Sequence, residues 1–507
     1  MKIKNCIKGY VQGINKVIPP KQTLKVVLRK IKNIDPPILE RFNEVLHPSK
    51  IPQYRFIGTD YYQRVCQSEG TNGKGHFKEQ ALASGIMELV ERYSCNKYIR
   101  NKKVMRLSTF NALTDNIFQL QEIYSNCINE TYVRTIDDNT LKKVKLSWHQ
   151  GYTLDGKRVF LPMLLIAHLL EGTNGMASGN SLEEALLHGI CEVIERHCLT
   201  LINLNKIVTP LIKISTINYP IAKELIGKFQ SLKQEIYIKD FSLGIGLPVI
   251  GVVRNIDGRN CLITAGVATT SEEALIRALT ENSQADGKIN YVKISAAKHY
   301  FINDKVVAME DIPTIENKDL KSELDNIKRI LNAQNMRAYF LNTTDKELDL
   351  PSVMVFIAGA KYFDASIAYR NLWVAIIEMY IKNGDYGSAE KYLGKAIKCD
   401  KKNRAYYVYI KGVLLKRTGR YREAMKYFRK VLKEIGIAEF KRNSLFNLGL
   451  CSQALNQVDN AVKYYKKVIK FYPEFRIEFL TFDNDVELFK RAKIIYQGLE
   501  RDCHEME

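Results

Sequence analysis

A twelve-residue pattern of apolar and charged residues occurs twice in this chain, at an offset of 104 positions. Residues 81–92 read ALASGIMELVER, and residues 185–196 read ALLHGICEVIER. Residues 274–284, ALIRALTENSQ, form a third and more divergent copy. The apolar positions recur with helical spacing, so the pattern predicts equivalent helices, and its repetition predicts a domain with internal pseudo-symmetry.

Each copy divides into an apolar face and a charged face when it is placed on a helix at about 100° per residue. The charged faces carry Ser84, Glu88, Glu91 and Arg92 in the first copy, and Glu184, His188, Glu192, Glu195 and Arg196 in the second. Such a face is usually a solvated surface, and Glu184 also fits a capping box with Ser181. A solvated face would drift in sequence, so identical polar positions in two copies favour a shared functional site.

The chemistry of these faces points to a cation and to phosphate. Glu-x-x-Glu pairs on facing helices concentrate negative charge, which is costly unless a cation offsets it. Ligand sets made only of oxygen favour Mg²⁺ over zinc or copper. The interleaved Arg92 and Arg196 suit phosphate oxygens, which a guanidinium binds in a bidentate way. The faces therefore predict a site for Mg²⁺ together with nucleotide phosphates.

The common nucleotide-binding motifs are missing from the sequence. Residues 70–75, GTNGKG, are rich in glycine but lack the spacing of a P-loop. They stand just before the first charged helix, where their backbone could approach an anion. The alternative is a plain flexible loop.

Two further regions define the rest of the architecture. Residues 236–253 and 336–357 each read as a strand, a loop with Leu-Pro and a second strand, which predicts a mixed α+β domain. Near the C-terminus GDYGSA at 384–389 recurs as GRYREA at 419–424 and, more weakly, as QVDNA at 457–461. This period resembles tetratricopeptide repeats, which are stacked helical hairpins. We expect an α+β domain over residues 1–365, three all-α repeats over 366–478, and a capping helix with a tail over 479–507.

Composition narrows the class of protein further. The chain is 46% hydrophobic and 26% charged, as in globular proteins. Its longest mostly apolar run, residues 160–170, is too short to span a bilayer, and no signal peptide stands out. Ten scattered cysteines form no C-x-x-C pair, which predicts reduced thiols and a cytoplasmic location.

The net charge of +21 fits either an anionic partner or a lysine-rich, solvated surface. Ten basic residues and a single acidic one fall within residues 404–433, in the predicted repeats. The aromatic residues of this segment occupy packing positions, so no stacking platform for bases is expected. The segment therefore favours an acidic peptide or protein partner over nucleic acid.

The charged helices, with Gly73-Lys74-Gly75 before the first of them, resemble the YcaO family over about residues 5–365. The matching motifs are Ser-x-x-x-Glu-x-x-Glu-Arg, and Asn-x-x-x-Glu followed by Glu-x-x-Glu-Arg. The resemblance implies an ATP- and Mg²⁺-dependent enzyme that activates a peptide-bond oxygen and yields an azoline or a thioamide. It also implies a peptide or protein substrate, with a sulfur donor or partner protein docked on the repeats, and no membrane.

The resemblance also implies roles for particular residues, although none is assigned to catalysis. The expected metal ligands are Glu88, Glu91, Glu184, Glu192 and Glu195. The expected ATP contacts are Lys16, Thr23, Lys74, Ser84, Arg92, Asn180, Arg196, Glu281 and Gln284.

The chain departs from the family pattern in two places. The third helix has Asp286 where the family often has an arginine, which puts one phosphate contact in question. The chain ends in CHEME rather than in the proline-rich tail of azoline-forming members. A non-catalytic accessory factor or scaffold for a sulfur-inserting enzyme that modifies a ribosomal protein is therefore the alternative function.

Overall fold

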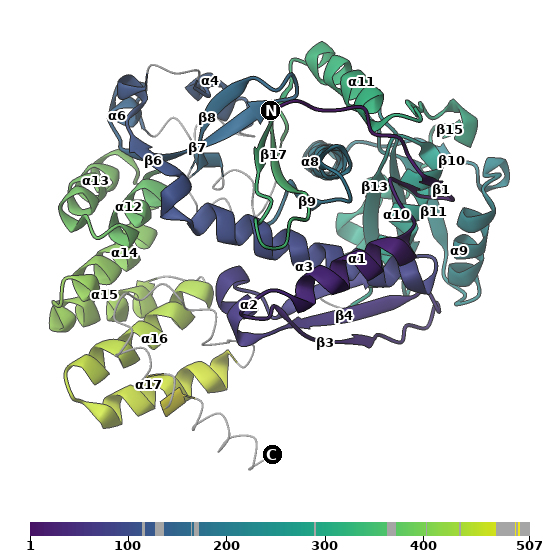
Figure 1. The fold of residues 1–507 in the computed structure, drawn as a ribbon. Helices are drawn as coiled ribbons and strands as arrows, with labels where there is room; N and C mark the ends of the chain where they lie inside the picture. The colour runs from purple at the N-terminus through teal and green to yellow at the C-terminus, as the bar shows by residue number, and fades with distance from the viewer. Residues whose placement is uncertain are drawn as a thin grey trace. The chain divides into compact units, whose positions relative to one another are not determined.

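The computed structural model describes residues 1–113, 117–126, 136–163, 165–166, 172–287, 290–361, 372–401, 403–434, 438–472, 492 and 495–496. The chain forms two compact units (Figure 1). The first comprises residues Met1–Ile128 and Lys145–Phe363, and the second comprises Asn129–Val144 and Asp364–Glu507. No helix of the described residues is long and apolar enough to cross a membrane.

The first unit contains β-sheets with helices packed between and against them. Among the described residues one sheet has the order β14-β13-β12-β11-β10-β15, another β6-β7-β16-β17-β9 with β8 beside β7, and a third β3-β4-β5. Their bounds are β3 Leu39–Glu44, β4 Gln53–Gly58, β5 Gly70–Lys74, β6 Met105–Ser108, β7 Leu146–Thr153, β8 Arg158–Pro162, β9 Met176–Ser178, β10 Leu211–Ile212, β11 Ile236–Asp240, β12 Val249–Asn255, β13 Asn260–Val267, β14 Val292–Lys293, β15 Val306–Val307, β16 Arg337–Asn342 and β17 Ser352–Ala358.

A short hairpin of β1 and β2 and several helices complete this unit. Their bounds are β1 Tyr10–Val11, β2 Asn15–Lys16, α1 Pro20–Lys32, α2 Asp60–Cys66, α3 Lys78–Arg100, α4 Leu120–Tyr124, α8 Leu182–Asn205, α9 Pro220–Gln230, α10 Ser271–Gln284 and α11 Leu320–Ala333. Both predicted strand pairs are present, because β11 pairs antiparallel with β12 and β16 with β17. The predicted α+β class is confirmed.

Each of the three copies of the sequence pattern lies within a helix, and each helix follows a strand: α3 follows β5, α8 follows β9, and α10 follows β13. The first two copies share the same close approach of backbone to helix. A Cβ atom on Gly75 would lie 2.7 Å from the Ala81 nitrogen, and one on Gly179 would lie 2.5 Å from the Ala185 nitrogen. Only glycine fits at these two positions, so the pseudo-symmetry extends to backbone packing.

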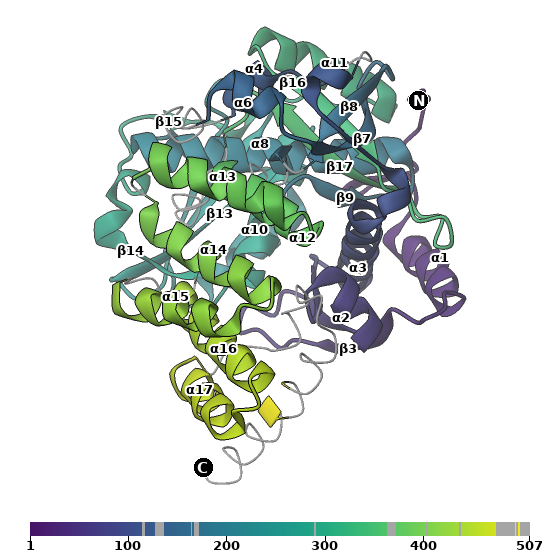
Figure 2. The same cartoon turned by 90° about the vertical axis from the view of Figure 1, so that its left-hand side faces the viewer.

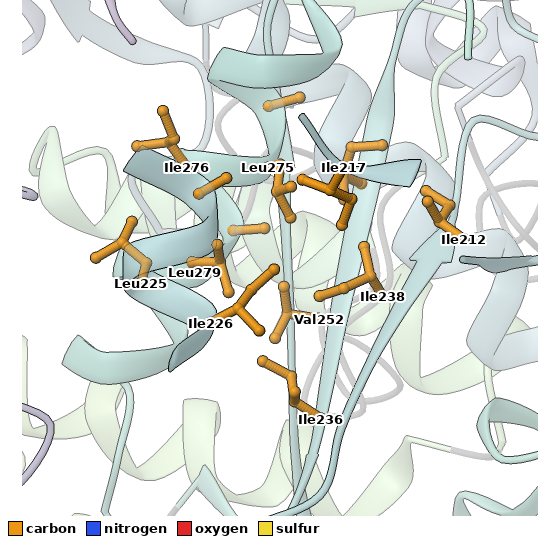
Figure 3. Close-up of a cluster of buried hydrophobic side chains, with 14 of the residues drawn as sticks. Ile212, Ile217, Leu225, Ile226, Ile236, Ile238, Val252, Leu275, Ile276 and Leu279 are labelled. Carbon is orange, nitrogen blue, oxygen red and sulfur yellow. The ribbon is translucent and has the colours of Figure 1, made fainter. Parts of the chain in front are cut away.

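A cluster of buried aliphatic side chains lies between α9 and α10 on one side and β11 and β12 on the other (Figure 3). Leu225, Leu275, Ile238 and Val252 are fully buried within it. Burying a side chain of this size contributes about 1.5–3 kcal/mol. The cluster fixes α10 against its sheet and so sets which face of α10 stays polar.

The second unit is a run of helical hairpins (Figure 2). Its helices are α6 Asp138–Lys142, α12 Leu372–Lys382, α13 Tyr386–Cys399, α14 Arg404–Arg417, α15 Tyr421–Glu434, α16 Ala438–Ala454 and α17 Val458–Phe471. Gly384 and Gly419 adopt positive φ between paired helices, and Gly412 leaves room for the Phe428 ring. The predicted repeats are confirmed as helical hairpins among the described residues, which exclude residues 366–371, 402, 435–437 and 473–478 of the predicted range.

The predicted capping helix and tail, residues 479–507, lie outside the described residues except at three positions. Two of these, Ala492 and Tyr496, are buried in a cluster with Phe446 and Tyr465 of the last hairpin. Tyr496 therefore covers apolar surface at the end of the repeats.

Candidate functional site

A polar cavity of about 350 Å³ opens between α3, α8 and α10. All fourteen of the metal- and ATP-site residues predicted from the sequence line it: Lys16, Thr23, Lys74, Ser84, Glu88, Glu91, Arg92, Asn180, Glu184, Glu192, Glu195, Arg196, Glu281 and Gln284. The chain therefore brings together side chains that are up to 268 residues apart in sequence.

The three helices supply this cavity from equivalent positions. At four equivalent positions, spaced as one stripe of a helix, all three helices contribute a side chain to the lining. In α3, α8 and α10 respectively, these are Gln80, Glu184 and Glu273; Ser84, His188 and Arg277; Glu88, Glu192 and Glu281; and Glu91, Glu195 and Gln284. The polar faces of the three helices thus line one cavity.

Burial strongly affects the carboxylates of this cavity. It raises the pKa of Glu91 well above its ordinary value, against the effect of Arg92 and with the help of Glu192 and Glu88. Burial likewise raises the pKa of Glu192. A bound cation would stabilise the charged forms of Glu91 and Glu192.

No group of three or more His, Cys, Asp or Glu side chains in the described ranges converges closely enough to form a metal site by itself. Mg²⁺ usually takes only one or two carboxylates from the protein and fills its remaining positions with water and substrate phosphates, so it does not require such a group.

Three hydrogen-bond donors of cavity residues are buried with no partner among the described residues. They are Arg92 Nη1, Arg196 Nε and Gln284 Nε2. The other side of each guanidinium is engaged, since Arg92 Nη2 lies 3.1 Å from Glu88 Oε1 and Arg196 Nη2 lies 3.4 Å from Glu195 Oε1. A buried donor without a partner is costly, so these groups fit an anionic ligand with several oxygens, such as a triphosphate.

Lys74 stands at the end of β5. Its Nζ donates to Gln284 Oε1 at 3.1 Å and pairs with Glu281. Burial lowers the pKa of Lys74 to about 8, although Glu88 opposes that shift. The expectation of a loop at residues 70–75 is wrong, because residues 70–74 pair with β4 as an antiparallel strand. Strand pairing holds Lys74 in place at the cavity.

The N-terminal segment closes one side of the cavity. Thr23 Oγ1 donates to Asn180 Oδ1 at 3.0 Å, and Asn180 Nδ2 donates to Glu184 Oε1 at 3.0 Å. Glu184 Oε2 also accepts from the Val17 backbone N–H at 2.9 Å. Ser181 Oγ caps α8 by accepting from the Glu184 N–H, which is one half of the predicted capping box. The Glu184 carboxylate accepts from the Asn180 N–H at 3.3 Å in place of the Ser181 N–H, and so belongs to the cavity wall.

Lys16 lies beside two residues of α8. Its Nζ contacts His188 Nε2 and lies 3.9 Å from Glu184 Oε1. Burial lowers the pKa of Lys16, while Glu184 and Glu273 raise it. Burial and the neighbouring Lys16 hold the pKa of His188 well below its ordinary value, so the imidazole is neutral and can accept from the lysine.

Sequence reasoning missed Glu273 and Arg277 as cavity residues. The sequence identifies Glu273 only as the partner of Thr270 in a possible helix cap, and Thr270 Oγ1 does accept from the Glu273 N–H. The register of the third copy was the available signal, because it aligns Arg277 with Ser84 and His188. Arg277 brings a third guanidinium to the cavity.

Asp286 lies outside the residues that line the cavity. Its carboxylate accepts from Arg254 Nη2 at 2.7 Å, lies 3.0 Å from His47 Nε2, and accepts from the Tyr291 hydroxyl. Burial raises the pKa of Asp286, but these three hydrogen bonds outweigh that effect and hold it well below its ordinary value. Asp286 has a structural role here, next to a fully buried arginine.

The class of protein follows from comparison of this chain with known families. A family model described as the ATP- and Mg²⁺-binding YcaO cyclodehydratase matches residues 72–361. Tetratricopeptide-repeat models match residues 373–403, 405–434 and 443–474. The chain thus combines a domain of a nucleotide- and magnesium-binding class without a P-loop and a set of tetratricopeptide repeats.

This chain belongs to the YcaO family. The predicted cofactors, ATP and Mg²⁺, are those of the family. An uncharacterized protein of Methanothermobacter thermautotrophicus is 24% identical over 387 residues, which are 68% of this chain and 95% of that protein. The Escherichia coli ribosomal protein S12 methylthiotransferase accessory factor YcaO is 29% identical over 247 residues. That match spans 44% of this chain and 42% of the E. coli protein.

Two solved structures share the fold. A heterocyclase in complex with substrate and cofactor has a TM-score of 0.59 at 18% identity, covering 72% of this chain and 55% of that one. YcaO from Methanopyrus kandleri, bound with AMPPCP and Mg²⁺, has a TM-score of 0.54 at 19% identity, covering 70% of this chain and 94% of that one.

Proposed function

We propose that this protein uses ATP and Mg²⁺ to activate a backbone amide of a peptide or protein, leading to a thioamide or an azoline. The observation that carries the proposal is the cavity, where three equivalent helices place carboxylates next to buried donors without partners. That combination matches the needs of a magnesium-bound triphosphate. YcaO from Methanopyrus kandleri, whose solved structure is bound with AMPPCP and Mg²⁺, supports the same ligand.

The residues divide into two groups by their chemistry. Carboxylates would hold Mg²⁺ and order the phosphates: Glu88, Glu91, Glu184, Glu192 and Glu195. Neutral and basic side chains, with two residues of α10, would contact the nucleotide: Lys16, Thr23, Lys74, Ser84, Arg92, Asn180, Arg196, Glu281 and Gln284. Arg277 joins this second group, because its position in α10 is equivalent to that of Ser84 in α3.

Mg-ATP, when bound, would supply the phosphoryl group with which the amide oxygen leaves as phosphate, after a Cys, Ser or Thr side chain or a sulfide source has attacked the amide carbon. The chain's part is to orient the phosphates and stabilise their charge. The free edges of Arg92 and Arg196 would bind phosphate oxygens, and the ion pairs with Glu88 and Glu195 hold both guanidinium groups in place. Because both arginines are already positioned before the ligand arrives, little reorganisation accompanies binding.

The repeats would dock the substrate or a partner protein. Stacked helical hairpins form extended binding surfaces, and the basic residues exposed on α15 favour an acidic segment. The alternative function is an accessory factor that binds nucleotide without catalysis, next to a sulfur-inserting enzyme. The E. coli relative is named an accessory factor, and that name supports this second candidate function.

Calorimetry on two variants tests the site. We expect Glu192→Ala and Glu195→Ala each to weaken Mg-ATP binding by about 10- to 100-fold, as for other lost contacts around a metal. Glu224→Ala is the matched control, because Glu224 is exposed and pairs only with the neighbouring Lys228 among the described residues. Unchanged Mg-ATP affinity in both site variants would refute the assignment. ADP release that depends on added peptide separates the enzyme from the accessory factor.

A further inference from the structure

A second cavity, of about 430 Å³, adjoins the first. The two cavities share Glu195 and Arg196 of α8, Ala265 of β13, and Glu281 and Gln284 of α10. Its volume falls within the usual range for ligand pockets. The proposed nucleotide site does not account for the second cavity, although Glu195 and Arg196 line both cavities.

The second cavity runs along the edge of β13. It is lined by four consecutive residues of that strand, Leu262 to Ala265. Successive side chains of a strand point to opposite faces of its sheet, so four consecutive residues can border one cavity only where it follows the strand edge. In Figure 1, β13 lies beside α10 and α8.

This edge of β13 is open over most of its length. The neighbouring strand β14 pairs only with Asn260 and Cys261, and no strand in the described part of the chain pairs with residues 262–267 on that side. An unpaired edge presents backbone N–H and C=O groups, which form a template for an added strand.

Hydrogen bonds at the start of β13 show which of its residues face the open edge. The Arg259 carbonyl accepts from the Ile294 N–H on the β14 side, and the Asn260 carbonyl accepts from the Ile256 N–H on the β12 side, both at 2.9 Å. Backbone groups alternate along a strand, so Ile263 and Ala265 direct their N–H and C=O towards the cavity.

We propose that an extended peptide pairs with β13 along Leu262 to Ala265, as an added strand in the second cavity. The proposal rests on the proposed function and names how its substrate is held. Every other amide of such a peptide bonds to β13, and the amides between them are turned away from that strand. A free amide could then meet the shared Glu195 and Arg196, where the two cavities join.

A proline at position 263 tests the pairing. Ile263→Pro removes an edge N–H but no hydrogen bond of the β12–β13 ladder, and proline is tolerated on strand edges. Ile263→Val is the matched control, because it keeps the N–H. The probe is the tightest peptide selected by the full chain, with Mg²⁺ and AMPPCP, from a random decapeptide library.

We expect Ile263→Pro to weaken this peptide at least tenfold, with Ile263→Val unchanged. On the wild-type chain, methylating single backbone nitrogens of the peptide should weaken binding only at alternate positions, a result that does not depend on how the proline variant folds. Peptide binding should also slow hydrogen exchange at the Ile263 and Ala265 amides. Methylation effects without alternation, or unchanged exchange at both amides, would overturn the strand pairing.

The affinity for Mg-ATP, measured on the same samples, separates the two proposals. Peptide pairing at β13 without any Mg-ATP binding would reject the proposed function and leave the peptide site in place. Mg-ATP binding without protection of the β13 edge would reject only the peptide site.

Discussion

Replacing Asp286 by asparagine should destabilise the α+β domain without weakening nucleotide binding. The carboxylate is the only acidic partner of Arg254 in the described structure, and the Arg254 side chain is fully buried. Removing one member of a buried ion pair costs about 3–5 kcal/mol. Arg254 keeps three further hydrogen bonds, to Asn282 Oδ1 at 2.7 Å, to Gln234 Oε1 at 2.6 Å and to the Asn282 carbonyl at 3.4 Å. These lower the expected loss to about 3 kcal/mol.

The assay is thermal unfolding of the full chain, followed through the transition of the α+β domain. A loss of this size lowers the melting temperature of a domain of this length by about 4 °C. Asp286→Arg should cost more, because it places a second guanidinium against Arg254. Mg-ATP affinity of Asp286→Asn should equal that of the wild type.

The pH dependence of this difference follows from the lowered pKa of Asp286. A depressed carboxyl pKa contributes stability above the unfolded-state pKa, about 4, and this contribution is lost as the pH falls towards the folded-state value. The gap between wild type and Asp286→Asn should stay constant from about pH 7 to pH 5 and narrow below about pH 4. Equal melting temperatures at pH 7, or an asparagine variant that no longer binds Mg-ATP, would refute this reasoning.

Three further predictions concern other parts of the molecule. Lys74→Ala should lower Mg-ATP affinity at least tenfold while leaving the melting temperature nearly unchanged. Wild-type affinity should fall as the pH rises through about 8, where Lys74 loses its proton, and calorimetry across that range should show no such step in the variant. Gly179→Ala should cost about 1–3 kcal/mol of stability in denaturant unfolding, because its Cβ would lie 2.5 Å from the Ala185 nitrogen; a neutral effect would mean that the backbone yields there. Residues 366–507 alone should fold as a helical domain by circular dichroism, and residues 1–365 should keep Mg-ATP binding but lose modification of the full substrate; full-rate modification by the truncated chain would exclude the repeats as docking site.

Local periodicity was enough to predict the repeats, both Leu-Pro strand pairs and two faces of the cavity. Each of these signals lies within a short stretch of sequence. The second copy of the helical pattern, at residues 185–196, supported the prediction made from the first copy, at residues 81–92. The glycine content of residues 70–74 suggested a loop, but these residues form a strand. Their pairing with β4 is a contact between separate segments, which local composition does not reveal.

The remaining features depend on contacts between distant segments. The pairing of Asp286 with Arg254 and His47 joins three elements and leaves no periodic trace in the sequence. Arg277 was missed for a different reason. The third copy of the pattern has diverged so far that only its register shows that Arg277 is equivalent to Ser84 and His188. The open edge of β13 depends on how short β14 is, which no local pattern encodes.

Three equivalent helices line one cavity, and the differences between their side chains fix the orientation of a ligand in it. At one level all three helices present glutamate, namely Glu88, Glu192 and Glu281; at the level of Ser84, His188 and Arg277 the side chains are a hydroxyl, an imidazole and a guanidinium. Three helices with identical side chains at every level would offer a ligand equivalent orientations. The unequal levels remove that equivalence, so we expect a single substitution at the level of Ser84, His188 and Arg277 to change the ligand's orientation and leave the fold intact.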